Sequence, residues 1–279
     1  MAKQLLGKPV ADRLKERLSA EIEKRRRMGK ALGFAAVRVG DDPSSVVYQG
    51  RLVKAAATLG FEPLEIALPE GSSETEVIEK LKALGEDEKI AGILLFMPLP
   101  KGLDKGRISR AIPIEKDVDA LNPVQFGDVM AGRSLWAPCT ARAVMEMADY
   151  YEYDLTGKHV VIIGRSDVVG RPLAQLMLAR NATVTVCHSR TKDLALHTRS
   201  ADLVVPAVGQ AGILTRDMLK PGAWVIDVGI NVRPDGQGII GDADFASCEP
   251  ICEAISPVPG GVGAISVTMV LEALLRDQD

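Results

Sequence analysis

Two kinds of hydrophobic and polar pattern alternate along the first part of the chain. Charged residues at helical spacing over 9–29 predict a solvated amphipathic helix. The continuous apolar runs LGFAAVRVG (32–40) and KIAGILLFMPLP (89–100) are typical of strands buried on both faces. Between them the pattern predicts a helix over 45–59, a short strand over 61–69, and a further helix that opens with a Ser-x-x-Glu cap. Strands alternating with helices indicate a parallel sheet with crossover helices.

A second series of strands and helices follows an irregular stretch. PVQFGDVMAGRSLWAPCT (123–140) is punctuated by Gly and Pro, and we interpret it as the region between two domains. The second series comprises a helix over 141–152, the strand HVVIIG (159–164), a helix over 169–180, and the strands TVTVCH (183–188), DLVVPAVG (202–209) and AWVIDVG (223–229). The chain ends in a Gly-rich loop and an amphipathic helix, which we expect to return to the first domain.

The predicted fold class is therefore α/β with two domains. We expect residues 1–136 together with 262–279 to form an N-terminal α/β domain, and residues 137–261 to form a Rossmann-type domain.

Composition and charge exclude several classes of protein. Among 279 residues, 34 Lys and Arg stand against 37 Asp and Glu, so the net charge of −3 gives no basic field for nucleic acid. No run approaches the ~20 apolar residues of a membrane span, and the charged N-terminal stretch lacks a signal-peptide core. We expect a cytoplasmic protein without membrane or nucleic-acid partners. Four scattered cysteines without a CxxC pair, and three histidines not spaced as ligands, predict no metal site.

The stretch GRSDVVG (164–170) follows a strand and opens a helix, as the first turn of a dinucleotide-binding unit does. It lacks the middle glycine of the common pattern and has one additional residue. We expect Gly164 to allow the tight turn and Gly170 to let the helix approach the sheet, with helix N–H groups facing a pyrophosphate. For this motif alone, a plain α/β crossover without a ligand is the alternative.

The end of the next strand bears on the choice of cofactor. Cys187-His188-Ser189-Arg190 contains no Asp or Glu, which NAD sites usually place there to bind the ribose 2′-hydroxyl. Arg165 lies in the phosphate turn as well. Two arginines and a serine would attract a 2′-phosphate, so the sequence favours NADP over NAD, although either arginine singly could be a solvated surface residue.

Taken together, these motifs resemble the bifunctional methylenetetrahydrofolate dehydrogenase/methenyltetrahydrofolate cyclohydrolase family over nearly the whole chain. The matching stretches, in the family's order, are VGDDPSSVVY (39–48), GILLFMPLP (92–100), KDVDALNP (116–123), APCTARAV (137–144), VVIIGRSDVVGRPLA (160–174), TVTVCHSRT (183–191), VIDVGIN (225–231) and SPVPGGVGAIS (256–266). The resemblance implies tetrahydrofolate derivatives bound in a cleft between the two domains, NADP as cofactor, and a homodimer formed through the Rossmann domains.

The resemblance also implies roles for individual residues. By position, Tyr48 is similar to the tyrosine that stacks near the pterin and Asp119 to the aspartate that holds the pterin ring, so these two are the expected catalytic residues. The expected substrate contacts are Tyr48, Leu52, Phe96, Pro98, Asp119, Pro259, Gly260 and Gly261. The expected cofactor contacts are Gly164, Arg165, Ser166, Gly170, Ser189, Arg190 and Ile230.

Two departures from the family pattern affect groups that handle protons. Leu52 takes the place of the lysine in Tyr-x-x-x-Lys, and Phe96 takes the place of the glutamine in GILVQLPLP. Residues four apart share a helix face, so Leu52 is the neighbour of Tyr48, whereas Lys54 points away. Arg51 is nearer to that face but stays protonated at any usable pH. Smaller changes, at Ala120, Ala141 and Ala264, alter backbone stiffness more than chemistry.

These departures separate the two reactions of the family. Hydride transfer from the one-carbon bridge requires placement of two bound molecules, whereas hydrolysis of the methenyl bridge requires general acid–base groups. The sequence therefore predicts NADP-dependent oxidation of 5,10-methylenetetrahydrofolate, with cyclohydrolase activity weak or lost. Two alternatives stay open: a non-catalytic folate- or NADP-binding paralogue with a regulatory or partner role, and a dehydrogenase for a different small substrate that prefers an apolar pocket.

Overall fold

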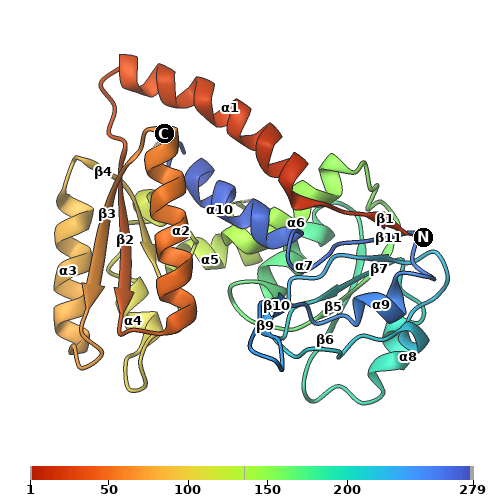
Figure 1. The fold of residues 1–279 in the computed structure, drawn as a ribbon. Helices are drawn as coiled ribbons and strands as arrows, with labels where there is room; N and C mark the ends of the chain where they lie inside the picture. Colours follow the sequence, from red (N-terminus) through yellow and green to blue (C-terminus); the bar gives the residue numbers. More distant parts are fainter. Residues whose placement is uncertain (1, 135, 277–279) are drawn as a thin grey trace. The chain divides into compact units, whose positions relative to one another are not determined.

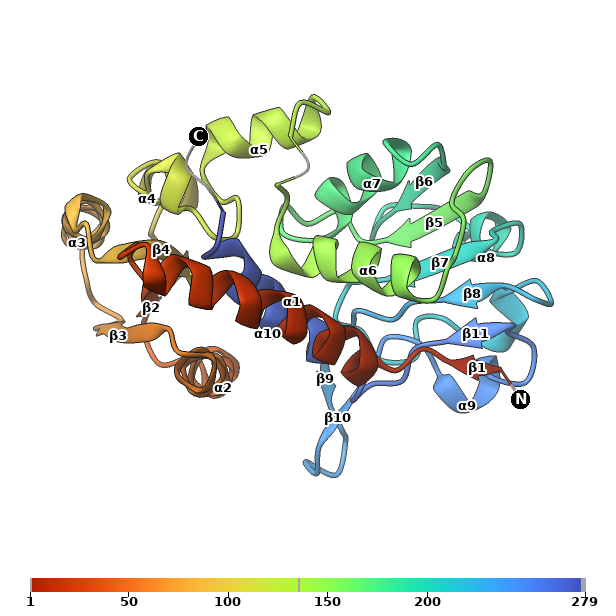
Figure 2. The same ribbon diagram turned by 90° about the horizontal axis from the view of Figure 1, so that it is seen from above.

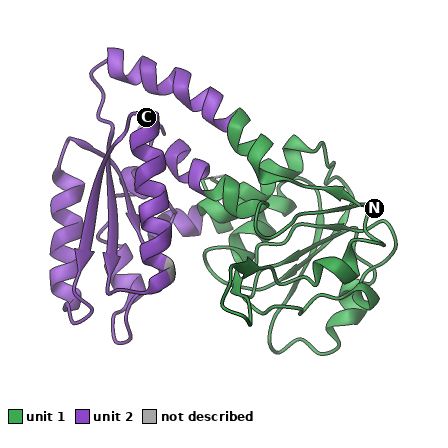
Figure 3. Ribbon diagram, in the orientation of Figure 1, with its two compact units in different colours: residues 1–13, 129–266 green, residues 14–128, 267–279 purple. Residues whose placement is uncertain are grey.

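The computed structural model describes residues 2–134 and 136–276, in which strands and helices alternate as predicted (Figure 1). The chain divides into two compact units (Figure 3): unit 1 contains residues 1–13 and 129–266, and unit 2 contains residues 14–128 and 267–279. These bounds differ from the predicted domains at 129–136 and 262–266, which were predicted for the first domain and lie in unit 1, and at the N-terminus. There β1 (Lys3–Gln4) belongs to unit 1, because it pairs in parallel with β11 (Ala254–Ile255) at the edge of the sheet.

Unit 2 is built on a three-stranded parallel sheet in the order β3-β2-β4. Its strands are β2 (Gly33–Val39), β3 (Glu62–Leu68) and β4 (Ile90–Leu95), and its larger helices are α2 (Pro43–Leu59) and α3 (Glu74–Glu86), which run along the sheet (Figures 1 and 2). The central strand β2 is almost entirely buried, as its unbroken apolar run predicts. The short helices of this unit are α4 (Lys105–Ser109) and the 3₁₀ turn η1 (Ile114–Lys116).

Local sequence explains where the helices of unit 2 begin. The side chain of Asp42 accepts a hydrogen bond from the backbone N–H of Ser45 and caps α2, whose first residue is Pro43. At α3 the predicted cap is confirmed: Ser73 and Glu76 form a reciprocal capping box.

Three of the described helices cross the unit boundaries. The helix α1 (Gly7–Arg27) passes from unit 1 to unit 2 after residue 13, α5 (Pro123–Met130) passes from unit 2 to unit 1 after residue 128, and α10 (Val262–Ala273) passes back to unit 2 after residue 266. Within unit 2, the guanidinium of Arg25 on α1 donates a 2.5 Å hydrogen bond to the carbonyl of Leu275, just after α10. Leu274 lies against Gly92 of β4, where an added Cβ atom would come within 2.5 Å of its side chain.

Unit 1 contains a six-stranded parallel sheet in the order β1-β11-β8-β7-β5-β6. Its further strands and helices are α6 (Cys139–Tyr150), β5 (His159–Ile163), α7 (Gly170–Leu178), β6 (Thr183–Cys187), α8 (Leu194–Thr198), β7 (Leu203–Pro206), the 3₁₀ turn η2 (Arg216–Met218), β8 (Trp224–Val225) and α9 (Phe245–Cys248). Helices α6 and α7 lie side by side (Figure 2). The strands β9 (Asn231–Val232) and β10 (Ile239–Ile240) form a separate antiparallel hairpin.

The order of these strands fixes where a ligand can bind. From β5 the chain moves outward to β6 and then returns to the other side of β5 to form β7. Loops leave the sheet in opposite directions at this point, and a crevice opens beyond the carboxyl ends of β5 and β7 in sheets of this kind. The predicted Rossmann-type arrangement is therefore confirmed for unit 1.

One predicted segment is wrong. The stretch 123–140 was expected to be irregular, yet it contains the helix α5 (Pro123–Met130). Asn122 precedes this helix, and its side-chain oxygen accepts from the N–H of Val124 while its carbonyl accepts from the N–H of Phe126. Asn before a Pro at the first helical position is a start signal, which the surrounding glycines obscured. In the part of the chain that the structure describes, no helix is long and apolar enough to cross a membrane.

Candidate functional site

The predicted cofactor residues meet at the carboxyl edge of the sheet in unit 1. Strands β5 and β6 pair with Ile163 opposite Cys187, and the N–H of Gly164 donates to the carbonyl of Cys187 at 2.8 Å. The residues after each strand therefore leave the sheet side by side. This register places Arg165 and Ser166 at the same edge as Ser189 and Arg190, and all four side chains are exposed.

Steric space explains both glycines of the turn. Gly164 has φ +134°, and a Cβ atom added there would lie 2.5 Å from the carbonyl oxygen of Ala207, which follows β7. A Cβ atom added at Gly170 would lie 2.1 Å from the carbonyl oxygen of Gly164. The first glycine lets the neighbouring loop approach, and the second lets the start of α7 close onto the turn. Any larger residue at either position would move the backbone of this turn, at which the sequence predicts a pyrophosphate.

Polar groups of the turn organise the start of α7. The hydroxyl of Ser166 accepts from the N–H of Val169 at 3.2 Å, and the carbonyl of Ser166 accepts from the N–H of Arg171 at 3.1 Å. The Arg171 guanidinium pairs with Asp167 at 2.6 Å. Arg165 and Arg190 are exposed cations at this edge, as are Arg171 and Lys192. Guanidinium groups at such an edge are suited to bind the phosphates of a dinucleotide. Ile230, also expected at the cofactor, is 63% exposed and follows β8.

Two buried aspartates that the sequence analysis missed hold the neighbouring loops. Asp242 is fully buried, and its carboxylate accepts hydrogen bonds from the N–H groups of Val208, Gly209 and Gln210 after β7. Asp227 accepts from the N–H groups of Gly229, Asp242 and Ala243. The pKa of Asp227 is raised to about 6, chiefly by burial and to a smaller extent by the charge of Asp242, while the backbone hydrogen bonds act in the opposite direction. The motif VIDVGIN contains Asp227, but nothing in its letters indicates burial.

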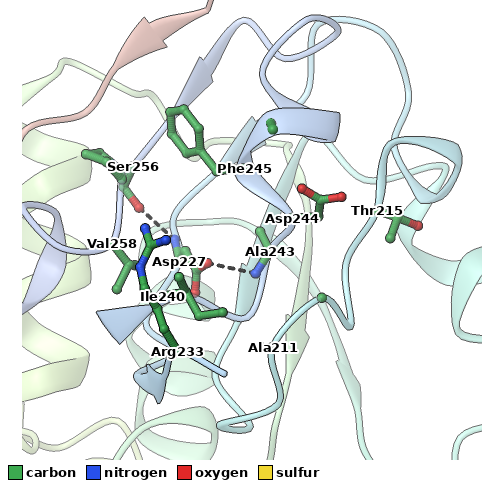
Figure 4. Close-up of a pocket in the computed structure, with 14 residues that line it drawn as sticks. Ala211, Thr215, Asp227, Arg233, Ile240, Ala243, Asp244, Phe245, Ser256 and Val258 are labelled. Carbon is green, nitrogen blue, oxygen red and sulfur yellow. Dashed lines mark hydrogen bonds between the residues drawn. The ribbon is translucent and has the colours of Figure 1, made fainter. Parts of the chain in front are cut away.

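A cavity of about 610 Å³ opens beside Asp227 (Figure 4). In this view the N–H of Asp227 donates to the Ser256 hydroxyl at 2.8 Å, and the N–H of Ala243 donates to the Asp227 carboxylate at 2.8 Å. Arg233, from the β9–β10 turn, and Phe245, from α9, also line it. None of the residues predicted for the cofactor or the substrate lines this cavity, so it does not coincide with the predicted site.

The predicted substrate residues of unit 2 lie on α2 and at the end of β4. The rings of Tyr48 and Phe96 meet edge to face, with centroids 5.9 Å apart and planes at 71°. Leu52 is fully buried, and Phe96 is only 6% exposed. Arg51 and Lys54 are exposed. The position one helical turn after Tyr48 is therefore the inward one, and an apolar side chain occupies it.

The remaining substrate residues divide between the two units. In unit 2, Pro98 is exposed two residues beyond Phe96, and Asp119 is partly buried in the turn that follows η1. In unit 1, Pro259, Gly260 and Gly261 form the loop between β11 and α10. The carbonyl of Gly260 accepts from the N–H of Gly7 at 2.7 Å, and a Cβ atom added at Gly7 would overlap the carbonyl of Gly261, so the loop is held against the start of α1.

The sequence analysis also missed the buried carboxyl of Asp117. Its side chain is 2% exposed, and burial raises its pKa to about 6. This residue is the first aspartate of KDVDA, so it stands two positions before Asp119. The signal was present in the motif, but only the fold shows that the first aspartate faces inward. Among residues 2–134 and 136–276, no group of three or more His, Cys, Asp or Glu side chains could hold a metal ion.

Comparison with known families gives two matches that together cover most of the chain. Residues 5–119 match the catalytic domain of tetrahydrofolate dehydrogenase/cyclohydrolase, and residues 138–278 match the NAD(P)-binding domain of the same family.

Individual relatives agree with these matches. The bifunctional protein FolD of Acetivibrio thermocellus is 43% identical over 275 residues, which cover 99% of this chain and 96% of that protein. The crystal structure of the bifunctional enzyme FolD, methylenetetrahydrofolate dehydrogenase/cyclohydrolase, from Campylobacter jejuni is 39% identical with a TM-score of 0.95, covering 99% of this chain and 98% of that one. Trypanosoma brucei FolD, solved with NADP cofactor and inhibitor, is 35% identical with a TM-score of 0.92, covering 98% and 96%.

Proposed function

This chain belongs to the tetrahydrofolate dehydrogenase/cyclohydrolase family, and we propose that it oxidises 5,10-methylenetetrahydrofolate with NADP while hydrolysing the methenyl product weakly or not at all. The observation that carries the proposal is the environment of Tyr48. A fully buried Leu52 occupies the next helical turn, and Phe96 packs against the tyrosine ring. The carboxyl edge of unit 1, by contrast, keeps its glycines and its exposed arginines.

The oxidation needs binding and orientation from the protein. When bound, NADP supplies the acceptor for the hydride that leaves the one-carbon bridge of the substrate. In this proposal Gly164, Ser166 and Gly170 shape the turn for the pyrophosphate, and Arg165, Ser189 and Arg190 hold the 2′-phosphate. Tyr48 and Asp119 orient the pterin. The lone pair of the ring nitrogen drives hydride departure, so no protein base is required.

The hydrolysis needs a group that exchanges protons. Water must add to the methenyl carbon, and a proton must reach the departing nitrogen. An amine at the buried position 52 would have a lowered pKa, because burial disfavours its charged form, and could pass protons at neutral pH. Leu52 has no titratable atom, and Phe96 provides no amide to hold water. Loss of one acid–base group typically removes ~10²–10⁴-fold of rate.

The other readings have less support. The relatives reported above are named as enzymes, so none of them favours a non-catalytic paralogue or a different substrate. A homodimer through unit 1 stays part of the proposal, supported by the apolar side chain of Val232, which is 72% exposed on the β9–β10 hairpin. A cytoplasmic location stays a prediction of the sequence.

The direct test is an assay of both half-reactions on the same purified protein. We expect methylenetetrahydrofolate and NADP to yield NADPH and a methenyl product. This product should then be hydrolysed no faster than it is without enzyme. A relative that has lysine and glutamine at positions 52 and 96 is the matched control. Enzymatic hydrolysis at the rate of that relative would refute the loss of cyclohydrolase activity, and absence of NADPH formation would refute the dehydrogenase.

A further inference from the structure

The turn that carries Asp119 is anchored to the sheet of unit 2 through Asp117. Asp117 forms a parallel bridge with Ile93 of β4, and the N–H of Val118 donates to the carbonyl of Ile93 at 3.2 Å. Strand β4 continues from Ile93 to Leu95, and Phe96 follows directly. The backbone of Asp117 is therefore fixed to the strand that leads into the proposed pterin site.

The side chain of Asp117 binds the backbone of the same turn. Its Oδ2 atom accepts from the N–H of Asn122 at 2.6 Å, and hydrogen bonds from the backbone of Leu121 and Asp119 also stabilise its charged form. These three residues lie on both sides of Ala120. One carboxylate thus accepts hydrogen bonds from backbone amides on both sides of Ala120, as an anion does in a backbone nest.

Ala120 needs such support. Its φ is +50°, in the left-handed region that side chains with a Cβ atom disfavour, and the family pattern KDVDG has glycine at this position. Asn122 extends the arrangement, since its side-chain amide donates to the carbonyl of Ile112 at 2.9 Å and its side-chain oxygen caps α5. The turn is therefore held at both ends while its centre adopts a conformation that alanine does not favour.

Two further facts indicate that the Asp117 side chain does more than stabilise the fold. Burial is the largest influence on the pKa of Asp117 and raises it to about 6, and the charge of Asp119 raises it as well. Within the described structure, the buried Oδ1 atom of Asp117 has no hydrogen-bond partner. A carboxylate in such surroundings destabilises the fold relative to a neutral side chain of the same shape.

We propose that Asp117 is a positioning residue for Asp119: its buried carboxylate holds the Ala120 turn in the left-handed conformation and so presents the Asp119 carboxyl to the pterin. The inference rests on the proposed function, because orientation of Asp119 matters only if a folate binds there. It adds to that function a role for Asp117, exerted through its contacts with the backbone of the turn and tested by Asp117→Asn.

The test compares Asp117→Asn, Ala120→Gly and the double variant with the unmodified protein in the dehydrogenase assay. Asn preserves the shape of the side chain but removes the charge, and charge-assisted hydrogen bonds are about twice as strong as neutral ones. We expect the KM for methylenetetrahydrofolate to rise about tenfold in Asp117→Asn, with the KM for NADP changed less than about twofold. In the double variant we expect the folate KM to return to within about threefold of the original, because glycine adopts positive φ without a carboxylate.

Asp104→Asn is the matched control. Asp104 is an exposed aspartate of unit 2 whose carboxylate also accepts a backbone N–H, that of Arg107, and we expect its loss to leave both KM values unchanged. Circular dichroism and the melting temperature of each variant show whether the fold is retained. Hydrogen exchange of the peptide that covers residues 117–122 gives a readout independent of activity. We expect faster exchange at Leu121 and Asn122 in Asp117→Asn.

The outcomes separate the two proposals. If the unmodified protein forms no NADPH, the proposed function fails, and the exchange rates of the turn still decide whether Asp117 holds it. If the unmodified protein is active and Asp117→Asn leaves the folate KM unchanged, the positioning role is wrong. A double variant as impaired as Asp117→Asn, or an equal rise in both KM values, would also overturn it, because either result indicates a general structural defect.

Discussion

The cofactor edge of unit 1 and the neighbourhood of Tyr48 in unit 2 depend on different features of the chain for their proposed roles. The first depends on space and backbone: two glycines clear the turn, and exposed arginines follow it. The second depends on single side chains, and two of them, Leu52 and Phe96, are buried and apolar where the family has a lysine and a glutamine. If the proposed function holds, phosphate binding depends on the space that glycines leave in a turn, whereas proton transfer depends on two side chains that can be replaced without a change of fold.

The largest effect should come from filling the space of the cofactor turn. In Gly170→Ala the new Cβ atom would lie 2.1 Å from the carbonyl oxygen of Gly164, so the start of α7 must move away from the turn. We expect NADP affinity to fall by at least about 100-fold, since the turn and the helix N–H groups lose their common geometry. Calorimetric titration with NADP measures this affinity.

Gly263→Ala is the control for that variant. Gly263 also belongs to unit 1, but a Cβ atom added there meets nothing within 4 Å. We expect unchanged NADP binding. Equal NADP affinities of Gly170→Ala and the unmodified protein would show that the turn does not bind the pyrophosphate. The proposed role of unit 1 in the comparison would then be wrong.

A gain of hydrolytic activity should test the proposed role of the side chains around Tyr48 in unit 2. Leu52→Lys combined with Phe96→Gln restores the family's two polar groups beside Tyr48. We expect methenyltetrahydrofolate hydrolysis to rise about 10²-fold or more, because a desolvated amine exchanges protons that leucine cannot. Leu52→Met with Phe96→Leu is the apolar control and should not hydrolyse. Dehydrogenase activity, measured on the same samples, reports whether the buried lysine is tolerated; a folded, active double variant without hydrolysis would contradict the assignment.

A smaller effect concerns stability, because among the described residues each unit contains a buried aspartate with a raised pKa, Asp117 in unit 2 and Asp227 in unit 1. For Asp117 the pKa rises from 3.8 to about 6, so the folded protein binds this proton more tightly than the unfolded chain. Its stabilising contribution is present below pH ~4 and is lost as the pH rises to about 6. In the unmodified protein, ionisation of Asp117 should lower the free energy of unfolding by about 2–3 kcal/mol over that range. In Asp117→Asn this decrease should be absent.

Urea unfolding at about pH 4.5 and about pH 7 measures the difference. The variant should gain stability relative to the unmodified protein at the higher pH, while Asp227, whose pKa burial also raises to about 6, retains its own dependence of the same sign in both proteins. A variant that becomes relatively less stable at the higher pH would show that the carboxylate is net stabilising, in contrast to the argument from burial.

The smallest effect concerns the choice between NADP and NAD. Arg190 is exposed at the end of β6, where its backbone N–H donates to the ring of His188 and its side chain is available for a 2′-phosphate. We expect Arg190→Ala to raise the KM for NADP about tenfold and to leave the KM for NAD unchanged. Arg216→Ala, an exposed arginine elsewhere in unit 1, removes the same charge and should change neither. Equal effects on both cofactors would refute recognition of the 2′-phosphate by Arg190.

Periodicity and turn chemistry were sufficient to predict most of the architecture. The apolar runs predicted the buried strands β2, β4 and β5, and the capping box predicted the start of α3. The helix α5 was missed, because the glycines around it obscured the start signal of Asn122 and Pro123. The short edge strand β1 was also missed, since its two residues pair with β11, which lies some 250 positions away in sequence.

The sequence by itself determined the two α/β series, the shape of the cofactor turn, and the replacement of a lysine and a glutamine by Leu52 and Phe96. The first two are properties of residues close together in the sequence, and the third follows from comparison with the family pattern. Only the tertiary structure decided that position 52 is fully buried, that Phe96 packs on Tyr48, and that the side chains of Asp117 and Asp227 are almost entirely buried. Desolvation depends on the segments that cover a side chain, and these come from distant parts of the chain.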